Sequence, residues 1–322
     1  MRDQFVINYI INAHHHPGQL HRMVKKLNDS GCRFYIHIDK GVEIKPFVEE
    51  IEPHDNILFV PKEYREYTPW GGVGFVRATL NLLRLISREN QEGYSILLSG
   101  QDYPVKSNAY IRQYLTKHYG TSFINTFPLP DARWAMGGLP RLTHYRVDRS
   151  GRRGDFYSLP SIYSPQFYTA GTIRGVLALM ISGRFRFLLS LLHRREFPKY
   201  LSPYGGSTWW AFPAETARQA LSFLDDHPDL LEYHEHTHCP DEILFQSLIR
   251  QLGKEGRIKD IRDSLTYVNW ERKGVPLPVT FSSGDFDELN KLGEHLLFAR
   301  KFDVESDSRI LDMIDRDIIP QW

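Results

Sequence analysis

Apolar residues in the first part of the chain come in short runs that alternate with longer amphipathic stretches. Two stretches, 18–30 and 72–88, repeat apolar residues every three or four positions, which is helical spacing. Four runs are typical of buried strands, and they cover residues 5–13, 33–39, 56–60 and 94–99. The alternation predicts an α/β fold with a mostly parallel sheet and right-handed crossovers.

The pattern is less regular after about residue 125. A basic loop at 146–155 leads to a Leu- and Phe-rich segment at 173–193. That segment also contains Arg174, Arg184 and Arg186. We interpret it as a core helix with solvated arginines, and an amphipathic surface that contacts anionic lipid is the alternative.

The remaining part of the chain is regular again. It predicts a strand at 208–212, a helix at 214–224 introduced by Pro213, and a further helix that begins at Pro240. Because no internal repeat or low-complexity linker divides the sequence, we expect a single domain over 1–322.

Composition narrows the class of protein. Of the 322 residues 41% are hydrophobic, which is enough for a large core. The 40 Lys and Arg residues balance 39 Asp and Glu residues, which argues against a nucleic-acid binder with a general basic surface. Cys32 and Cys239 cannot build a disulfide framework, and the first apolar run is too short to span a bilayer. We therefore expect a cytoplasmic protein, with peripheral contact at the inner membrane surface as a further option.

The most distinctive motif is Cys239-Pro240-Asp241-Glu242, which precedes an apolar helical pattern. A proline at a helix start places Asp241 and Glu242 in the first turn, where the helix dipole favours carboxylates. The pair could simply support the helix electrostatically. A carboxylate in that position at the rim of a pocket is also suited to act as a general base.

Polar residues mark the carboxyl ends of the predicted strands, where ligands of parallel sheets bind. Asp39 ends one strand, and Asp102 follows another in a turn before Pro104. Asp39 could accept hydrogen bonds from a uracil or a ribose, whereas Asp102 could equally cap its turn. Trp70 and the glycines that follow it offer an aromatic plate beside a closely approachable backbone.

Arg300 and Lys301 are adjacent in a segment with an extended pattern. Neighbouring side chains of an extended segment point to opposite faces, so one could enter a cleft while the other is solvated. A lysine ammonium in such a cleft could neutralise a diphosphate leaving group. An ordinary surface pair is the alternative.

Three histidines, His234, His236 and His238, alternate just before Pro240. If this stretch were extended, the three imidazoles would share a face in an arrangement that suits a metal ion. A zinc-dependent hydrolase that uses them is therefore a competing hypothesis.

Taken together, these motifs resemble those of the core-2/I-branching N-acetylglucosaminyltransferase family, which includes peptide O-xylosyltransferases. The resemblance runs from about Val6 to Asp303, and its order and spacing are more specific than any single motif. The segments that carry it are INAHHHP, YIHIDK, WGG, LLSGQDYPVKSN, GSTWWAF, CPDEILFQSL, YVNW and LFARKFD.

The resemblance implies a GT-A-like fold, with a nucleotide-binding part at roughly 1–125 and an acceptor and catalytic part at roughly 126–322. It implies an inverting transfer from a UDP-sugar to a glycan, with UDP-GlcNAc as the first donor to consider and UDP-xylose as the second. It also implies no cofactor and no divalent metal, and no Asp-x-Asp sequence occurs in the first part of the chain. A non-catalytic glycan-binding protein is a further alternative.

Carried over residue by residue, the resemblance makes Glu242 the base, places Lys301 against the donor diphosphate and places Asp39 against the nucleotide. The other residues expected to contact the donor are Ala13, His14, Trp70, Gly71, Asp102 and Arg300. The residues expected to contact the acceptor are Arg133, Trp134, Trp209, Asp241 and Trp270.

One position departs from the family pattern. An arginine that helps to neutralise the diphosphate would fall within 276–280, where this chain has no basic residue. The candidates to replace it are Arg272, Lys273, Lys291 and Arg300.

Overall fold

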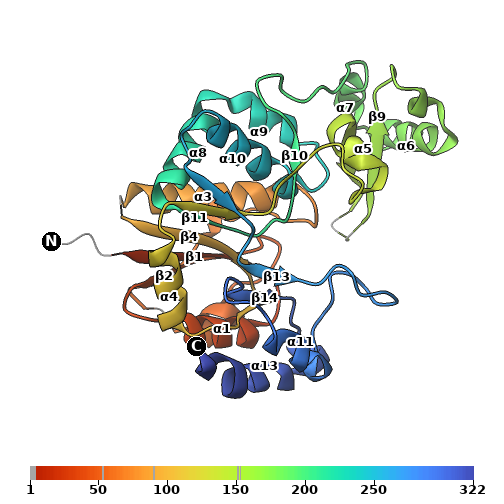
Figure 1. The fold of residues 1–322 in the computed structure, drawn as a ribbon. Coiled ribbons are helices and arrows are strands. Elements are labelled where there is room, and N and C mark those ends of the chain that lie inside the picture. Colours follow the sequence, from red (N-terminus) through yellow and green to blue (C-terminus); the bar gives the residue numbers. More distant parts are fainter. Residues whose placement is uncertain (1–4, 53, 90, 151, 153) are drawn as a thin grey trace.

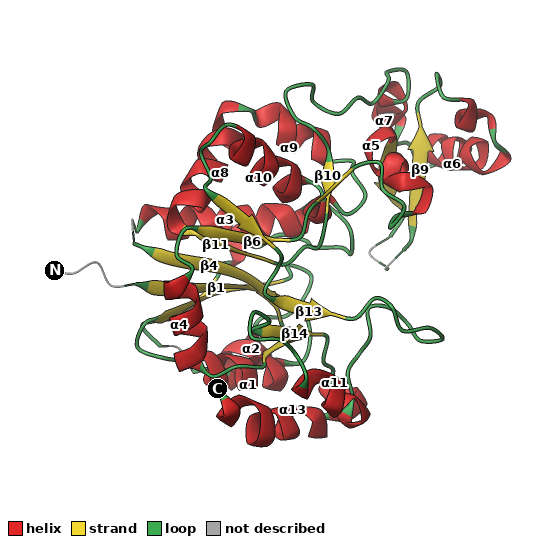
Figure 2. Ribbon diagram, viewed as in Figure 1, coloured by secondary structure: helices red, strands yellow, loops and turns green. Residues whose placement is uncertain are grey.

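The computed structural model describes residues 5–52, 54–89, 91–150, 152 and 154–322, and for Arg186 the backbone alone. Its centre is a seven-stranded sheet with helices against both faces (Figures 1 and 2). In spatial order the strands are β12 (Asp260–Arg262), β6 (Thr121–Ile124), β11 (Trp210–Pro213), β4 (Gly93–Ser99), β1 (Val6–Ala13), β2 (Cys32–Ile38) and β3 (Ile57–Phe59).

The central strands are parallel, as predicted. β1 pairs in parallel with β2 and β4, whereas β11 runs antiparallel to β4 and β6. Every residue of β1 is buried because helices cover both faces, and this explains its almost continuous apolar run. The strands expected at 5–13, 33–39, 56–60, 94–99 and 208–212 are all present, with ends that differ by one or two residues.

Two helical layers enclose the sheet. The layer on one face consists of α1 (Pro17–Leu27), α2 (Lys45–Glu50), α4 (Asn108–Lys117) and α13 (Arg309–Met313). The layer on the other face consists of α3 (Gly74–Arg88), α8 (Ala214–Asp226), α9 (Pro228–His234) and α10 (Leu244–Lys254). In β1, Tyr9 and Ile11 join the first core and Ile10 joins the second, as strand alternation requires. The predicted α/β class, with a mostly parallel sheet flanked by helices, is confirmed.

A smaller sheet lies just beyond the carboxyl end of β4. Its strands are β13 (Thr266–Val268), β14 (Phe298–Arg300) and β5 (Asp102–Pro104). The register aligns Arg300 with Asp102, although 198 residues separate them in the chain. The sheet therefore brings the LFARKFD segment against the turn that follows β4, and α11 (Phe286–Asn290) and α12 (Val304–Asp307) flank that segment in sequence.

Residues 139–195 form a lobe that projects from the main body, at the upper right of Figure 1. The lobe consists of α5 (Leu139–Thr143), β8 (His144–Asp148), β9 (Phe156–Pro160), α6 (Ala170–Ile181) and α7 (Phe185–Ser190). Of the basic loop expected at 146–155, residues 146–148 belong to β8, the remainder lies between β8 and β9, and Gly151 and Arg153 lie outside the described residues. Short strands β7 (Phe127–Pro128) and β10 (Tyr204–Gly205) pair where the chain enters and leaves this part of the molecule.

The interpretation of 173–193 as one core helix is wrong. The segment forms two helices, and the chain turns between them at Gly183, whose φ is 71°. Each helix leaves one apolar side exposed. Among the described helices, none combines the length and the apolar content needed to cross a membrane.

Candidate active site

The candidate site lies at the edge of the large sheet where the parallel strands end. Ala13 and Ser99 are the last residues of β1 and β4, and Asp39 directly follows β2. Because β11 is antiparallel to β4, its start lies at the same edge, and Trp209 immediately precedes it. The strand order reverses around β1, which is the usual place for ligands of open α/β sheets.

The Asp39 carboxylate organises the loop after β2. It accepts hydrogen bonds from the Gly41 N–H at 2.7 Å and from the Thr68 N–H at 2.6 Å. Burial alone would raise the pKa of Asp39, but these hydrogen bonds outweigh it and hold the pKa below its usual value. Asp39 therefore stays ionised, and it fixes the approach to the Trp70-Gly71 loop.

Ala13 and His14 lie next to this carboxylate. The Asp39 N–H donates to the Ala13 carbonyl at 3.0 Å, which continues the pairing of β1 with β2. His14, one residue beyond β1, is exposed. The two residues predicted to contact the donor thus lie at the same strand-end edge as Asp39.

Asp102 is fully buried and faces Arg300. Its Oδ2 accepts hydrogen bonds from the Ser99 N–H at 2.5 Å and from Arg300 at 3.3 Å. Burial raises the pKa of Asp102, and the Arg300 guanidinium counteracts that rise. Asp102 is therefore a buried anchor for Arg300, and its complete burial differs from the donor contact expected for it.

Trp209 lies beneath Arg300 rather than on an open surface. The guanidinium carbon of Arg300 is 4.3 Å from the centre of the Trp209 ring. The ring also packs edge-on against Phe75, and Trp209 is 7% exposed. An acceptor platform was expected here, but burial leaves little of the ring available to an acceptor.

Lys301 follows Arg300 at the end of the small sheet. Its N–H donates to the Val279 carbonyl at 3.3 Å, and its carbonyl accepts from the Phe281 N–H at 2.8 Å. The carbonyl of the next residue, Phe302, accepts a hydrogen bond of 3.1 Å from the side chain of Gln19 on α1. These bonds fix the backbone of Lys301 beside the carboxyl ends of β1 and β4.

The candidates for a second diphosphate-neutralising cation differ in their partners. Arg272 makes two ion pairs of 2.7 Å, with Asp285 and Glu288, so its charge is already balanced. Lys273 and Lys291 are exposed. Of the four candidates, Arg300 is the one next to Lys301 at the strand-end edge, although it also binds Asp102.

Glu242 lies in a tight turn and not in the first turn of a continuous helix. Pro240–Glu242 is a 3₁₀ turn, and α10 begins only after Ile243, whose φ is −131°. The predicted helix start at Pro240 is therefore wrong by four residues. The Gly206 N–H donates to the Glu242 carbonyl at 3.0 Å and so fixes the turn against the loop before β11.

The Glu242 side chain is 21% exposed and forms an ion pair with Arg141 of α5. The guanidinium carbon of Arg141 lies 3.8 Å from the centre of the Trp134 ring. Burial, and then the charge of Asp241, raise the pKa of Glu242 to about 7, although Arg141 acts in the opposite direction. A partly exposed carboxylate that titrates near neutrality is suited to accept a proton.

Asp241 has a different partner. Its Oδ2 accepts a hydrogen bond of 2.6 Å from the Thr208 hydroxyl, and burial raises its pKa. Gln246 of α10 donates to the Ser207 carbonyl at 2.7 Å. Because Trp209 comes next in the chain, residues 207–209 connect the Glu242 turn directly to Arg300.

Trp70 and Gly71 contact the Glu242 turn from another side. The Gly71 carbonyl accepts a hydrogen bond of 2.9 Å from the Cys239 N–H. A Cβ on Gly71, whose φ is +71°, would lie 2.5 Å from a nitrogen of Arg146. Arg146 donates to the Trp70 carbonyl at 2.7 Å. The left-handed backbone at Gly71 favours glycine, and Trp70 is 43% exposed at the rim.

The three alternating histidines do not form a metal centre. Residues 234–238 have the His-Glu-x-x-His spacing of zinc proteases, but that motif requires both histidines on one helix, and α9 ends at His234. His234 is fully buried against Thr237, and the Nδ1 of His238 lies 3.0 Å from Arg146. Among the described residues, the three imidazoles are not one of the groups whose ligand atoms lie close enough to share an ion.

A different group in the described part of the chain has metal-ligand character. The ligand atoms of His16, Asp303 and Glu305 lie within 4.8 Å of one another. His16 is 3.5 Å from Asp303 and 3.4 Å from Glu305, whose side chain is 80% exposed. Asp303 also caps α12 through a bond from the Glu305 N–H, so these side chains have a structural role as well.

The remaining residues predicted to bind the acceptor differ in their exposure and in their partners. Trp270 is 54% exposed and comes two residues after β13, which pairs with the strand that ends at Arg300. Trp134 packs against Phe127 and beneath Arg141. The Arg133 side chain is 60% exposed and pairs with Asp131 at 2.8 Å.

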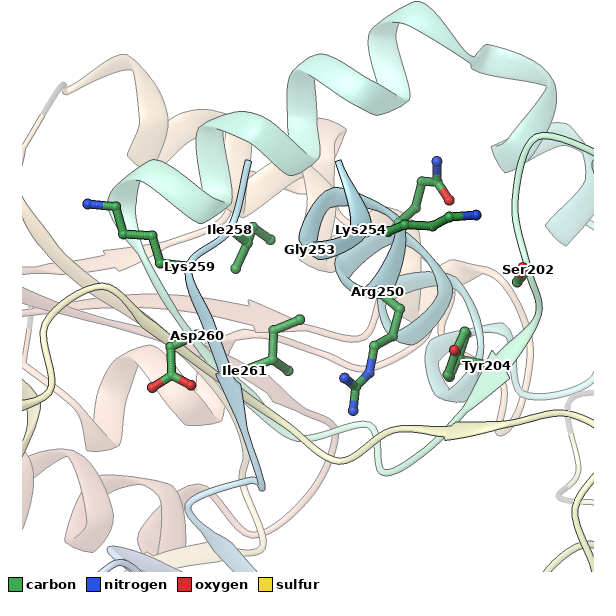
Figure 3. A pocket seen from close by; sticks show the side chains of 10 residues that line it. Ser202, Tyr204, Arg250, Gly253, Lys254, Ile258, Lys259, Asp260 and Ile261 are labelled. Atoms are coloured by element: carbon green, nitrogen blue, oxygen red, sulfur yellow. The ribbon is translucent and has the colours of Figure 1, made fainter. Parts of the chain in front are cut away.

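A separate hollow of about 450 Å³ lies between the end of α10 and β12 (Figure 3). Arg250, Lys254 and Tyr204 are among the residues that line it. None of the residues predicted for the site belongs to its lining. The chemistry that the motifs indicate therefore lies at the strand-end edge and not in this hollow.

Sequence reasoning missed three residues of the site. Arg141 pairs with the Glu242 carboxylate, Arg146 supports the Trp70-Gly71 loop, and Gln19 ties α1 to the Lys301 segment. Both arginines come from the irregular region after residue 125. The sequence offered one signal for them. Arg141 lies just before a short strand and Arg146 lies within it, and both have acidic or aromatic neighbours.

Comparison with known proteins shows similarity to one family. Residues 7–149 match the family model described as Core-2/I-Branching enzyme. Xylosyltransferase 2 of Homo sapiens is 23% identical over 92% of this chain and 32% of its own length. Xylosyltransferase 1 of Homo sapiens is 22% identical over 92% of this chain and 28% of its own length. The chain thus spans about a third of the length of these curated relatives.

The similarity to a solved structure is weaker than these sequence matches. The 4-diphosphocytidyl-2C-methyl-D-erythritolsynthase of Anaerococcus prevotii DSM 20548 is 12% identical, with a TM-score of 0.37 over 81% of this chain and 87% of that chain. The similarities that bear on function are therefore the match of residues 7–149 to the Core-2/I-Branching enzyme model and the likeness to xylosyltransferases over 92% of the chain. Residues 7–149, somewhat less than half of the chain, are thus similar to the Core-2/I-Branching enzyme family.

Proposed function

We propose that this protein is a glycosyltransferase that moves a sugar from a UDP-sugar to a glycan hydroxyl with inversion, and that Glu242 is its general base. One observation carries the proposal. The partly exposed Glu242 carboxylate, whose pKa burial and Asp241 raise, pairs with Arg141, and residues 207–209 connect its turn to the Arg300-Lys301 segment.

In the proposed reaction, Glu242 removes the proton of the acceptor hydroxyl as that oxygen attacks the anomeric carbon. The bond between the anomeric carbon and the diphosphate oxygen breaks, and its electron pair leaves with UDP. One base suffices because a single displacement inverts the centre without a covalent intermediate, as in inverting glycoside hydrolysis. Proton transfer to a positioned base contributes about 10²–10⁴-fold to the rate.

Lys301, with Arg300 beside it, neutralises the charge that develops on the departing diphosphate. Fixed cations can supply this stabilisation in a desolvated cleft, so the proposal requires no divalent metal and no cofactor. A metal ion would supply the same stabilisation as a Lewis acid, and His16, Asp303 and Glu305 are the described residues that could hold one. Chelation separates the two cases.

The nucleotide is proposed to lie along the strand-end edge beside Ala13, His14 and the Trp70-Gly71 loop. Asp39 is already engaged by Gly41 and Thr68, so its proposed task is to shape that loop as well as to contact the nucleotide. The acceptor is proposed to be a surface polysaccharide or lipid-linked glycan that contacts Trp270, Trp134 and Arg133.

The donor sugar is proposed from two candidates. The family name first favours UDP-GlcNAc. The curated relatives that match over 92% of the chain are named xylosyltransferases, which favours UDP-xylose. Both donors therefore belong in the first assay.

The test measures release of UDP from each donor with the purified protein, with and without EDTA, for the wild type and Glu242→Gln. We expect EDTA-resistant release that falls about 10²–10⁴-fold in Glu242→Gln while donor affinity is retained. Glu255→Gln is the matched control. Glu255 caps the end of α10 that is opposite the Glu242 turn, and it pairs with Arg257.

Each competing hypothesis predicts another result. A zinc-dependent hydrolase loses activity with chelator, and a non-catalytic glycan binder releases no UDP from any donor. Unchanged turnover in Glu242→Gln removes Glu242 from the mechanism. Release that stops with EDTA, and is also lost in Glu305→Gln, makes the reaction metal-dependent at the His16 group.

A further inference from the structure

The lobe of residues 139–195 carries a concentration of exposed apolar side chains. Of the nineteen large hydrophobic residues that are exposed in the described part of the chain, nine lie within 163–192. They are Tyr163, Tyr168, Ile173, Leu177, Met180, Ile181, Phe185, Leu189 and Leu192. Exposed apolar patches of this kind mark interaction sites.

These side chains lie on defined sides of the two helices. In α6, Ile173, Leu177 and Ile181 are spaced four residues apart and therefore lie along one side. Ile181 is 88% exposed. Leu179 is buried and packs with Leu159 of β9 on the side that holds the helix to the hairpin. The helix is therefore apolar on the side that anchors it and on the side that faces solvent.

Helix α7 continues the same surface. Phe185 and Leu189, four residues apart, are 59% and 61% exposed, and Leu192 just beyond the helix is 46% exposed. Leu191 is buried in the core of the lobe. Together, the exposed sides of α6 and α7 form what we call the apolar face of the lobe.

The charged residues within the segment that carries the apolar face are all basic, and Asp155 and Glu196 directly flank it. Residues 156–195 contain five arginines and no Asp or Glu. Arg174, Arg184 and Arg194 are exposed, whereas Arg195 is buried and binds backbone carbonyls and Thr237. Apolar side chains with an arginine rim and without acidic residues match an anionic surface.

We propose that the apolar face of the lobe docks on an anionic phospholipid bilayer. The aliphatic and aromatic side chains enter the boundary between headgroups and acyl chains, and the arginines contact lipid phosphates, as in interfacial helices. Symmetric contact with a second copy is disfavoured because it would bring two arginine-rich faces together.

Docking would also place the candidate active site close to the membrane. Arg141 and Arg146, on α5 and β8 of the same lobe, contact Glu242 and the Trp70 carbonyl. This consequence rests on the proposed function, and it suits a lipid-linked acceptor. The docking itself does not depend on any catalytic activity, so vesicle binding and UDP release can fail independently.

The test is flotation of the full chain with vesicles of phosphatidylcholine alone or of roughly three parts phosphatidylcholine to one part phosphatidylglycerol. We expect binding to the anionic vesicles that weakens when salt is raised from about 0.05 to about 0.5 M. The double variant Leu177→Ser/Ile181→Ser should lower the partition coefficient at least about tenfold. Val275→Ser, at an exposed apolar residue outside the lobe, should leave it unchanged.

A second pair of variants tests the charges. Arg174→Gln/Arg194→Gln should weaken binding to anionic vesicles, while Arg88→Gln/Lys117→Gln, at basic ends of α3 and α4, should not. Melting temperature and turnover of a soluble acceptor confirm that each variant is folded. Equal binding to neutral and anionic vesicles overturns the proposal. So does an unchanged partition coefficient in Leu177→Ser/Ile181→Ser, or a dimer of the wild type that this variant abolishes without any vesicle binding.

Discussion

Arg141 of the lobe pairs with the Glu242 carboxylate, although 101 residues separate the two in the chain. The arginine comes from α5, and the glutamate comes from the turn before α10. The protonation state of the proposed base is therefore set partly by a residue of the lobe. This relationship makes the pH dependence of the reaction a direct test of the site.

The wild-type enzyme should lose activity as the pH falls through about 7. Burial and Asp241 raise the pKa of Glu242 to about 7, so the carboxyl is protonated below that pH and cannot accept a proton. The measurement is kcat/KM for UDP release between about pH 5 and pH 9, with an acid limb expected near neutrality. A profile that stays flat down to about pH 5 would mean that no group with a raised pKa limits the reaction.

Removing the Arg141 charge should move that acid limb to higher pH. The guanidinium favours the ionised form of Glu242, so Arg141→Met raises the pKa of the base, and activity at pH 7 falls about fivefold if that pKa rises by one. Arg141→Lys should restore part of the original position because it retains a positive charge. Arg133→Met is the control, because Arg133 pairs with Asp131 and does not contact Glu242. If the acid limb of Arg141→Met coincides with that of the wild type, Arg141 does not influence the protonation of Glu242.

Breaking the buried pair between Asp102 and Arg300 should destabilise the fold. Asp102→Asn leaves the arginine without its carboxylate at a position where only 17% of the arginine side chain is exposed. Loss of one partner of a buried pair costs on the order of 3 kcal/mol of unfolding free energy, measured by urea denaturation. Asp131→Asn breaks an exposed pair and should cost less than about 1 kcal/mol. Similar losses in the two variants would contradict a structural role for Asp102.

The strand-end edge of the site could be predicted because local pattern and topology agree there. The apolar runs before Ala13, Asp39 and Ser99 are long enough to define strands, and parallel strands bring their carboxyl ends to one edge. The placement of Asp39 at that edge follows from the same rule, whereas Lys301 reaches it through the pairing of β14 with β5 in the small sheet. The hydrophobic pattern does not indicate which polar and aromatic side chains are buried. Asp102 and Trp209 are expected from the sequence to contact ligands, but neighbouring residues bury both of them.

The irregular middle of the chain could not be predicted in the same way. A Leu-rich segment has the same hydrophobic pattern whether it is buried or exposed to solvent. The pattern at 173–193 therefore predicts a core helix, although much of the segment is exposed. The role of Arg141 depends on a contact across 101 residues, which no local spacing indicates. The helix predicted from Pro240 fails because the non-helical backbone at Ile243 separates the acid turn from α10.

Lys301 provides the last prediction, because it separates leaving-group stabilisation from proton transfer. Lys301→Met should lower kcat for UDP release about 10²–10³-fold, since one preorganised charge no longer faces the diphosphate in the transition state. The acid limb of the pH profile should stay near 7, because the pKa of Glu242 is raised by its own burial and by Asp241. Lys117→Met, at an exposed lysine that ends α4, is the control and should retain full activity. If Lys301→Met keeps wild-type kcat, or regains it when manganese is added, a bound cation rather than this lysine stabilises the departing UDP.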